Sequence, residues 1–387
     1  MKKPLRRALR TGASLMLSLT ALWAVAAAAP AESLDEAARS LGGSALPLAL
    51  LRFERGDFFS GSALSLPTAL ALRVTPMLLS QESAVTEAWS DELQQLPEPS
   101  RDGEDDEGTV LNAAPNEAAG ELPPITVRDN GVPAMTLRPS DPEGYAIYQN
   151  VYVNNASSAS LDAAELSFDF SAALTENAPQ VLIVHTHGCE AYTMPAGEEY
   201  VETDDHRTLD SNYNVVRVGD EIARVLSDAG IGVLHDRTLH DYPSYSGAYN
   251  RSLATIEKYL RDYPSITYVF DVHRDAVADA AGRNYKLICA EEPNAAQLEF
   301  VIGSNGGGLE HPQWKENLKL ACAVQSTLLR DYPTLLRPVI VRNSRYNQQA
   351  TPGSLLIEVG AAGNSLEEAL VAARLFADGF ARTVKGE

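Results

Sequence analysis

Apolar residues from about residue 140 onward follow two alternating periods, one typical of strands and one typical of helices. Short apolar runs bounded by polar residues predict buried strands at 180–187, 231–234, 266–272, 285–290, 298–303 and 354–359. Apolar positions spaced three and four apart predict helices at 212–229, 249–260, 314–329 and 365–384. Gly230 is a natural stop for the first helix, and Asn364 or Ser365 can cap the last. Strands that alternate with helices predict an α/β domain with a central, mostly parallel sheet flanked by helices.

The first 30 residues follow another pattern. Five lysines and arginines lie within the first ten residues, and an uncharged, largely apolar run follows at 11–29. This order is typical of an export signal. The run is longer than the apolar core of most cleaved signals, so we expect a retained single-pass membrane anchor with the remaining chain on the extracytoplasmic side. The small residues after the run leave cleavage as the alternative.

Composition divides the rest of the chain into two parts. Residues 31–135 form a variable region, and its segment 81–125 is rich in proline, glycine and acidic residues, which is typical of a disordered linker. We therefore expect three parts: an anchor at 1–30, the variable region, and a catalytic domain at 136–387.

Charge and cysteine content exclude several classes of function. The 31 basic residues are outnumbered by 52 acidic ones, giving a net charge of -21, which argues against nucleic acid as a partner. Three cysteines without a Cys-x-x-Cys pair do not suit a disulfide framework or a cysteine zinc site. A metal site in this chain would need histidine and carboxylate ligands.

Reactive side chains follow three of the predicted strands. The first strand ends in HTHGCE (185–190), a second in DVHRD (271–275), and the last contains Glu358. In α/β sheets, active sites gather at the carboxyl ends of the strands. We therefore predict that these three ends form one site.

The residue types indicate a zinc hydrolase. Catalytic zinc takes three nitrogen or oxygen ligands and leaves a position for water. His187, Glu190 and His273 are the predicted ligands, although another divalent ion would accept the same set. Glu358, in an otherwise apolar strand, is the predicted general acid and base. Arg274 and Asp275 follow His273 and are candidate substrate contacts.

Several alternatives stay open for these residues. His185 either supports the ligands or replaces His187, and Asp210 either caps the first helix or replaces Glu190 as ligand. Glu358 can instead form an ion pair with Arg274 or Arg342.

Two further side chains near these motifs allow other interpretations. Cys189 with a nearby histidine would suit a thiol hydrolase, but that mechanism leaves Glu358 and His273 without roles. His311 is either a substrate contact or a surface residue.

The motifs resemble the stage II sporulation protein P family. The resemblance rests on HTHGCEAY (185–192), DSNYNVVRVGDEIARVL (210–226), DVHRDA (271–276) and LLIEVG (355–360), and it covers about residues 140–387. One departure is Cys189, where the family pattern implies a small hydroxyl residue.

The resemblance implies a fold similar to zinc-dependent N-acetylmuramoyl-L-alanine amidases. It implies removal of stem peptides from peptidoglycan, and cleavage of peptide cross-links, at the septum during engulfment in endospore formers. It also implies two partners, the stage II sporulation protein D transglycosylase and the membrane protein stage II sporulation protein M. The implied ligands are a histidine of the HTH motif, a carboxylate and His273, with Glu358 catalytic.

Two rival functions fit the same residues. A zinc carboxypeptidase or endopeptidase acting on wall peptides would use the same ligand pattern. A non-catalytic wall-binding module would hold the metal as a structural ion.

Overall fold

A computed structural model of the protein describes residues 109–111, 124–139, 141–174 and 178–387. These residues belong to a compact unit that comprises Gly103–Glu387. The predicted membrane anchor and the variable region up to residue 108 lie outside the described residues. Within the part that is described, no helix is both long enough and apolar enough to cross a membrane.

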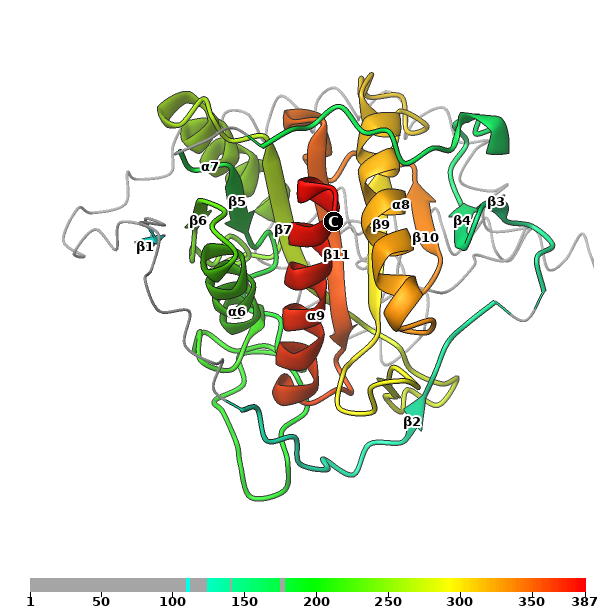
Figure 1. Ribbon diagram of the computed structural model, residues 1–387. Helices are drawn as coiled ribbons and strands as arrows, with labels where there is room; N and C mark the ends of the chain where they lie inside the picture. Colours follow the sequence, from blue (N-terminus) through cyan, green and yellow to red (C-terminus); the bar gives the residue numbers. More distant parts are fainter. Residues whose placement is uncertain (1–108, 112–123, 140, 175–177) are drawn as a thin grey trace, which may run out of the picture. The chain divides into compact units, whose positions relative to one another are not determined.

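A nine-stranded mixed sheet forms the centre of the unit (Figure 1). Its strands, in spatial order, are β1 (Thr109–Leu111), β6 (Val233–His235), β5 (Val181–Val184), β7 (Tyr268–Asp275), β11 (Gly353–Ala361), β9 (Leu298–Gly303), β10 (Val339–Arg342), β4 (Val151–Asn155) and β3 (Ala146–Tyr148). Parallel pairing joins β6, β5, β7 and β11, and again β9, β10 and β4. The two parallel groups meet at an antiparallel pair, β11 with β9.

Helices flank both faces of this sheet. α6 (Val215–Asp228), α8 (Trp314–Asp331) and α9 (Leu366–Lys385) share the larger apolar core with one face, and α7 (Ala248–Asp262) packs on the other. The alternation of strand side chains explains the division, because Val181 and Ile183 enter the larger core while Leu182 and Val184 meet Ile256 of α7. Two short 3₁₀ helices, η3 (Ala163–Glu165) and η4 (Gln348–Ala350), complete the described helices.

Capping residues mark the ends of α6 and α9, and one of the predicted caps is wrong. Asn214 is the N-cap of α6, its side chain accepting a hydrogen bond from the Val216 amide at 3.0 Å. The prediction that Asp210 caps this helix is therefore wrong, because the chain turns around Asp210 before the helix begins. Gly230 adopts a positive φ of 77° just after α6, and Ser365 caps α9.

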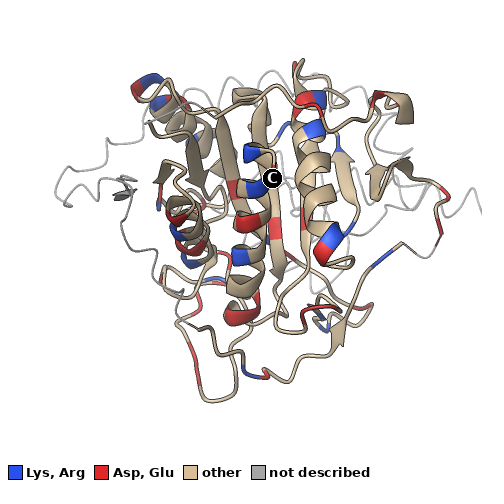
Figure 2. Ribbon diagram, viewed as in Figure 1, with Lys and Arg blue, Asp and Glu red and all other residues tan. Residues whose placement is uncertain are grey.

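The pattern of charges is mixed on the exposed surfaces of α6 and α9. Figure 2 shows acidic and basic residues interspersed along both helices. Between them, buried Glu221 of α6 contacts Arg224 of the same helix and Arg374 of α9. This interspersion is not the basic face that phosphate binding requires.

The segment before residue 136 belongs to the same unit as the main sheet. β2 (Ala134–Met135) pairs with β8 (Lys286–Leu287) in a separate two-stranded sheet. The Asn130 side chain donates to the carbonyls of Thr193 and Gly363. The predicted boundary at 135/136 thus falls directly after β2, and the predicted strand at 285–290 lies outside the main sheet.

Candidate active site

The three reactive strand ends meet at one edge of the sheet. β5, β7 and β11 are parallel neighbours, so their carboxyl ends lie together. His273 of β7 and Glu358 of β11 are direct partners in the strand register. Paired residues of neighbouring strands point to the same face, which places both side chains on the face that α7 partly covers.

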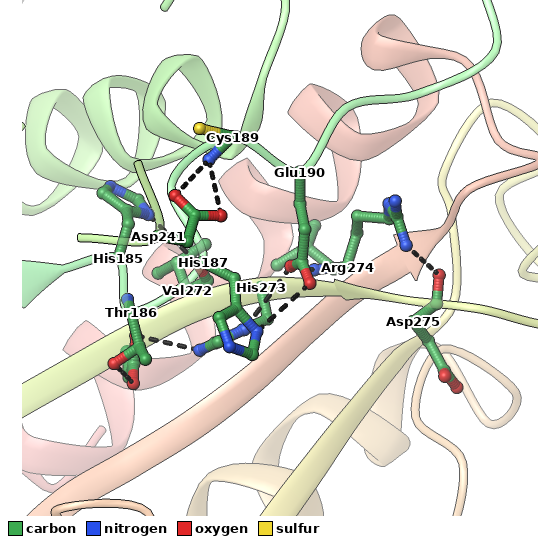
Figure 3. A network of polar contacts seen from close by, with 12 residues as sticks. His185, Thr186, His187, Cys189, Glu190, Asp241, Val272, His273, Arg274 and Asp275 are labelled. Atoms are coloured by element: carbon green, nitrogen blue, oxygen red, sulfur yellow. Dashed lines mark hydrogen bonds and ion pairs between the residues drawn. The ribbon is translucent and has the colours of Figure 1, made fainter. Parts of the chain in front are cut away.

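His187, Glu190 and His273 form a compact, buried group. One ligand atom from each residue lies within 4.8 Å of the others. His187 Nδ1 lies 3.4 Å from Glu190 Oε1, and His273 Nδ1 lies 3.4 Å from Glu190 Oε2. Figure 3 shows the three side chains directed toward one another. Among the described residues, this is the group of three with a geometry that can hold a metal ion.

Electrostatics in this group favour a positive charge beside Glu190. Burial alone would raise the pKa of Glu190, but His187 and His273 outweigh it and hold that pKa well below 4.5. Burial would lower the pKa of His273, but Asp271 and Glu190 raise it well above 6.5. Burial lowers the pKa of His187. A carboxylate that stays charged beside two imidazoles is a donor set that suits zinc.

Asp271 supports His273 from behind. Its Oδ1 lies 2.9 Å from His273 Nε2, although the angle there is outside hydrogen-bond geometry. The backbone amide and the hydroxyl of Thr186 both donate to the Asp271 carboxylate, at 2.8 and 2.6 Å. Burial opposes ionisation of Asp271, yet His273 and Thr186 lower its pKa to about 2. A carboxylate behind a ligand histidine fixes the ring and increases its basicity.

Glu358 carries a buried carboxyl oxygen, Oε2, without a hydrogen-bond partner among the described residues. Burial and the negative charge of Asp275 raise the pKa of Glu358 well above 4.5. Among the described residues, Glu358 forms no ion pair with Arg274 or Arg342. Arg274 donates to the carbonyls of Ala191 and His206, and Arg342 is exposed. A buried carboxyl oxygen without a hydrogen-bond partner costs stability, and a catalytic role is one reason for a protein to retain it.

Two more acidic side chains lie beyond Glu358. Glu299 of β9 is its antiparallel partner in register, and burial raises the pKa of Glu299 to about 7. The buried Arg337 side chain lies 3.5 Å from Glu299 Oε1 and 2.8 Å from Asp275 Oδ2. Asp275, predicted as a substrate contact, is thus tied to Arg337 at the edge of the site.

The remaining predicted residues lie around this group. His185 is fully buried behind it, with Nδ1 3.0 Å from the Val272 carbonyl oxygen and Nε2 2.8 Å from His235 Nε2. Burial and His235 lower the pKa of His185 to about 3. Asp210 is exposed and accepts hydrogen bonds from Asn212, so it lies outside the ligand group. Arg274 holds the segment after β5, and its amide donates to Glu190 Oε2 at 3.2 Å.

The thiol interpretation finds no support in the geometry. Cys189 is buried, its amide donates to Asp241, and its sulfur points away from His187 and His273 (Figure 3). Burial raises the pKa of the thiol, which disfavours the nucleophilic thiolate. His311 is also buried, 3.0 Å from Asn317 Oδ1, so its prediction as a surface residue is wrong.

Two contributors to the site were not singled out from the sequence. Asp271 lies two residues before His273, so the period of a strand already placed both on one face. Tyr245, by contrast, lies in the loop before α7 and stacks on the His187 ring with centroids 4.4 Å apart. No spacing in the sequence connects Tyr245 with His187.

The fold and the site define a mixed α/β protein with a buried His-Glu-His group and an adjacent carboxyl group. The family described as Stage II sporulation protein P matches residues 87–381, more than half of the chain, and the protein belongs to this family. Stage II sporulation protein P of Bacillus subtilis (strain 168) is 31% identical over 219 residues. The match covers 52% of this chain and 50% of that relative, so the chain spans about half the length of the curated protein it matches.

Solved structures with some likeness to the chain include two amidases. An N-acetylmuramoyl-L-alanine amidase from Clostridium difficile 630 is 19% identical, with a TM-score of 0.33, over 55% of this chain and 97% of that chain. The N-acetylmuramoyl-L-alanine amidase AmiC2 of Nostoc punctiforme is 14% identical, with a TM-score of 0.31, over 54% and 96%.

Proposed function

We propose that the protein is a zinc-dependent peptidoglycan hydrolase that acts as an N-acetylmuramoyl-L-alanine amidase. The observation that carries the proposal is the buried, unpartnered Oε2 of Glu358, on the strand beside the His-Glu-His group. A structural metal site requires its ligands and nothing more. A carboxyl group held beside the ligands without a partner is what hydrolysis needs.

The donor set fits a zinc ion on this structure's own geometry. We assign His187, Glu190 and His273 as ligands through His Nδ1 atoms and a carboxylate oxygen. Bound zinc would supply a Lewis acid that polarises the amide carbonyl and lowers the pKa of a water molecule. Asp271, held by Thr186, keeps the His273 ring oriented with Nδ1 toward Glu190.

Glu358 performs the proton transfers in this proposal. Its Oε2 takes a proton from the attacking water and passes it to the amide nitrogen as the bond to the carbonyl carbon breaks. The products are a carboxylic acid on the glycan side and a free amine on the stem peptide. The raised pKa of Glu358, caused by burial and Asp275, suits a group that must hold the proton between these two transfers.

The test is hydrolysis of purified peptidoglycan by the full chain, with and without a chelator. We expect release of intact stem peptides that stops with chelator, returns with zinc and is lost in Glu358→Gln. Shortened peptides that remain on glycan would instead identify a carboxypeptidase or endopeptidase. The hydrolase proposal would be refuted by a folded, zinc-loaded chain that binds the wall but does not hydrolyse it, even when stage II sporulation protein D is present.

We also propose the setting of this activity from the family resemblance. The catalytic unit would lie on the extracytoplasmic side of the cell membrane, held by the N-terminal anchor, and act on septal wall during engulfment. Homologues of stage II sporulation proteins D and M would be its partners. Fractionation of sporulating cells and co-purification from membranes test these two statements.

A further inference from the structure

An exposed tyrosine lies directly against the proposed ligands. The Tyr245 side chain is 49% exposed, yet its ring stacks on His187 with an interplanar angle of 26°. Its hydroxyl oxygen lies 3.4 Å from His187 Nδ1, the atom that is also 3.4 Å from Glu190 Oε1. The hydroxyl therefore faces the ligand atoms on one side, while much of the side chain faces the solvent from which a substrate must enter.

The loop that carries Tyr245 is held at both ends. Arg251 of α7 donates from Nε to the His240 carbonyl at 2.6 Å and from Nη1 to the Ser246 carbonyl at 3.1 Å. At the start of the loop, Asp241 accepts from the Cys189 amide and pairs with Arg207. These contacts fix the loop relative to the ligand-bearing turn.

Arg207 also connects the Tyr245 ring to the site. Its guanidinium carbon lies 5.1 Å from the centroid of that ring, within the range of a cation–π contact. Its Nη1 lies 3.9 Å from Glu190 Oε1. The tyrosine ring therefore contacts both His187 and Arg207, so its hydroxyl is placed before a substrate arrives.

Amide hydrolysis needs a hydrogen-bond donor in this position. As water attacks the amide carbon, the carbonyl oxygen gains negative charge, and a preorganised donor stabilises that charge. The phenol is a donor. The other side chains in contact with His187 do not offer an exposed donor. Glu190 is an acceptor, His273 is buried, and Tyr249 is more buried than Tyr245 and meets the ring edge-on.

We propose that the Tyr245 hydroxyl donates a hydrogen bond to the carbonyl oxygen of the scissile amide as that oxygen becomes negatively charged. Tyr245 is then a further catalytic residue, and this inference rests on the hydrolase proposed above. The hydrogen bond strengthens in the transition state, so it acts on kcat more than on KM.

Tyr245→Phe keeps the ring and its stacking and removes only the hydroxyl. Tyr242→Phe is the matched control, because Tyr242 is on the same loop and 52% exposed but has no described contact with the ligands. We expect Tyr245→Phe to lower kcat about 100-fold, as loss of one oxyanion donor does, with KM and zinc affinity unchanged. Tyr242→Phe should match the wild type in all three.

A binding measurement tests the same hydrogen bond without turnover. A stem-peptide phosphinate, whose tetrahedral phosphorus replaces the scissile carbon, imitates the charged oxygen, and a ketomethylene analogue keeps a planar, uncleavable carbonyl. Calorimetry on the zinc-loaded full chain should show Tyr245→Phe binding the phosphinate about 100-fold more weakly than the wild type. Its affinity for the ketomethylene analogue should be unchanged.

The outcomes separate this inference from the proposed function. Wild-type hydrolysis with an unchanged kcat and an unchanged phosphinate affinity in Tyr245→Phe would overturn the role of Tyr245 and leave the hydrolase standing. Loss of zinc affinity in Tyr245→Phe would also overturn it, because the hydroxyl would then serve the ligands and not the substrate. A folded, zinc-loaded wild type without hydrolysis, also in the presence of stage II sporulation protein D, refutes the proposed function itself.

Discussion

Replacing Asp271 with asparagine should weaken zinc binding while the fold remains. Asp271 contacts His273 Nε2 at 2.9 Å and is held by both donors of Thr186. An asparagine side chain is nearly isosteric and can still accept from Thr186. It removes the negative charge that supports the ligand histidine from behind.

The magnitude follows from the electrostatics of Asp271. Its pKa is about 2 against an ordinary 3.8, a difference worth about 2 kcal/mol of interaction with the charged carboxylate. This difference is the balance of burial, which raises the pKa, and of His273 and Thr186, which lower it. If the contact with His273 is taken to be of the same size, and zinc replaces the proton on that ring, the loss is on the order of 30-fold in affinity. Losses of 10- to 100-fold are typical when such a supporting carboxylate is removed.

The assay is competition for zinc against a chromophoric chelator at pH 7.5. Asp236→Asn is the matched control, because Asp236 is also buried and lies near a buried histidine, 3.9 Å from His240 Nε2, away from the ligand group. The control should bind zinc like the wild type. A folded Asp271→Asn variant whose zinc affinity stays within about 3-fold of the wild type would contradict the reasoning, since the supporting contact would then contribute little.

Three further predictions concern stability, measured as the free energy of unfolding in urea. The raised pKa of Glu299, about 7 against 4.5, means that the folded state keeps a proton that the unfolded state loses, so stability falls as pH rises from 4.5 through 7. Glu299→Gln should remove this slope, so between pH 4 and pH 8 the free energy of unfolding of the variant should rise by about 3 kcal/mol relative to that of the wild type. Equal pH slopes in the two proteins would contradict the prediction. Gly219→Ala should cost about 1–3 kcal/mol, because a Cβ there would lie 2.6 Å from His235 Nε2 and 2.7 Å from His185 Nε2; a neutral change would mean that the two rings can move. Ser365→Ala should cost about 1 kcal/mol through loss of the α9 cap, with zinc affinity unchanged because Ser365 is not one of the proposed ligands; an unchanged free energy of unfolding would contradict the role of the cap.

The grouping of His187, Glu190 and His273 could be predicted from the sequence because it depends on short segments at strand ends. His187 and Glu190 belong to one turn after a strand, and His273 lies at the end of a neighbouring strand that the apolar pattern predicts. Parallel strands bring such ends together whatever the details of packing. The uncertainty between Glu190 and Asp210 had a different cause, because only the path of the chain before α6 takes Asp210 away from the group.

The order of the strands in the sheet could not be predicted from the apolar periodicity of the sequence. The sequence pattern of β9 predicts one more buried strand. In the structure β9 runs antiparallel to β11, and this pairing brings Glu299 beside Glu358. Apolar periodicity shows that a strand is buried but not its direction or its neighbour. β10 and the pair of β3 and β4 were not predicted at all. They are short strands at one side of the sheet, and β3 is its outermost strand.

From the amino-acid sequence we could therefore predict the alternation of strands and helices, the family, and the turn and strand ends that carry His187, Glu190, His273 and Glu358. These depend on periodicity and on residue types within short segments. The folded structure was needed for the antiparallel centre of the sheet, the support of His273 by Asp271 and Thr186, and the stacking of Tyr245 on His187. Such contacts join side chains far apart in the chain, and packing selects them from many partners that local patterns leave equally possible.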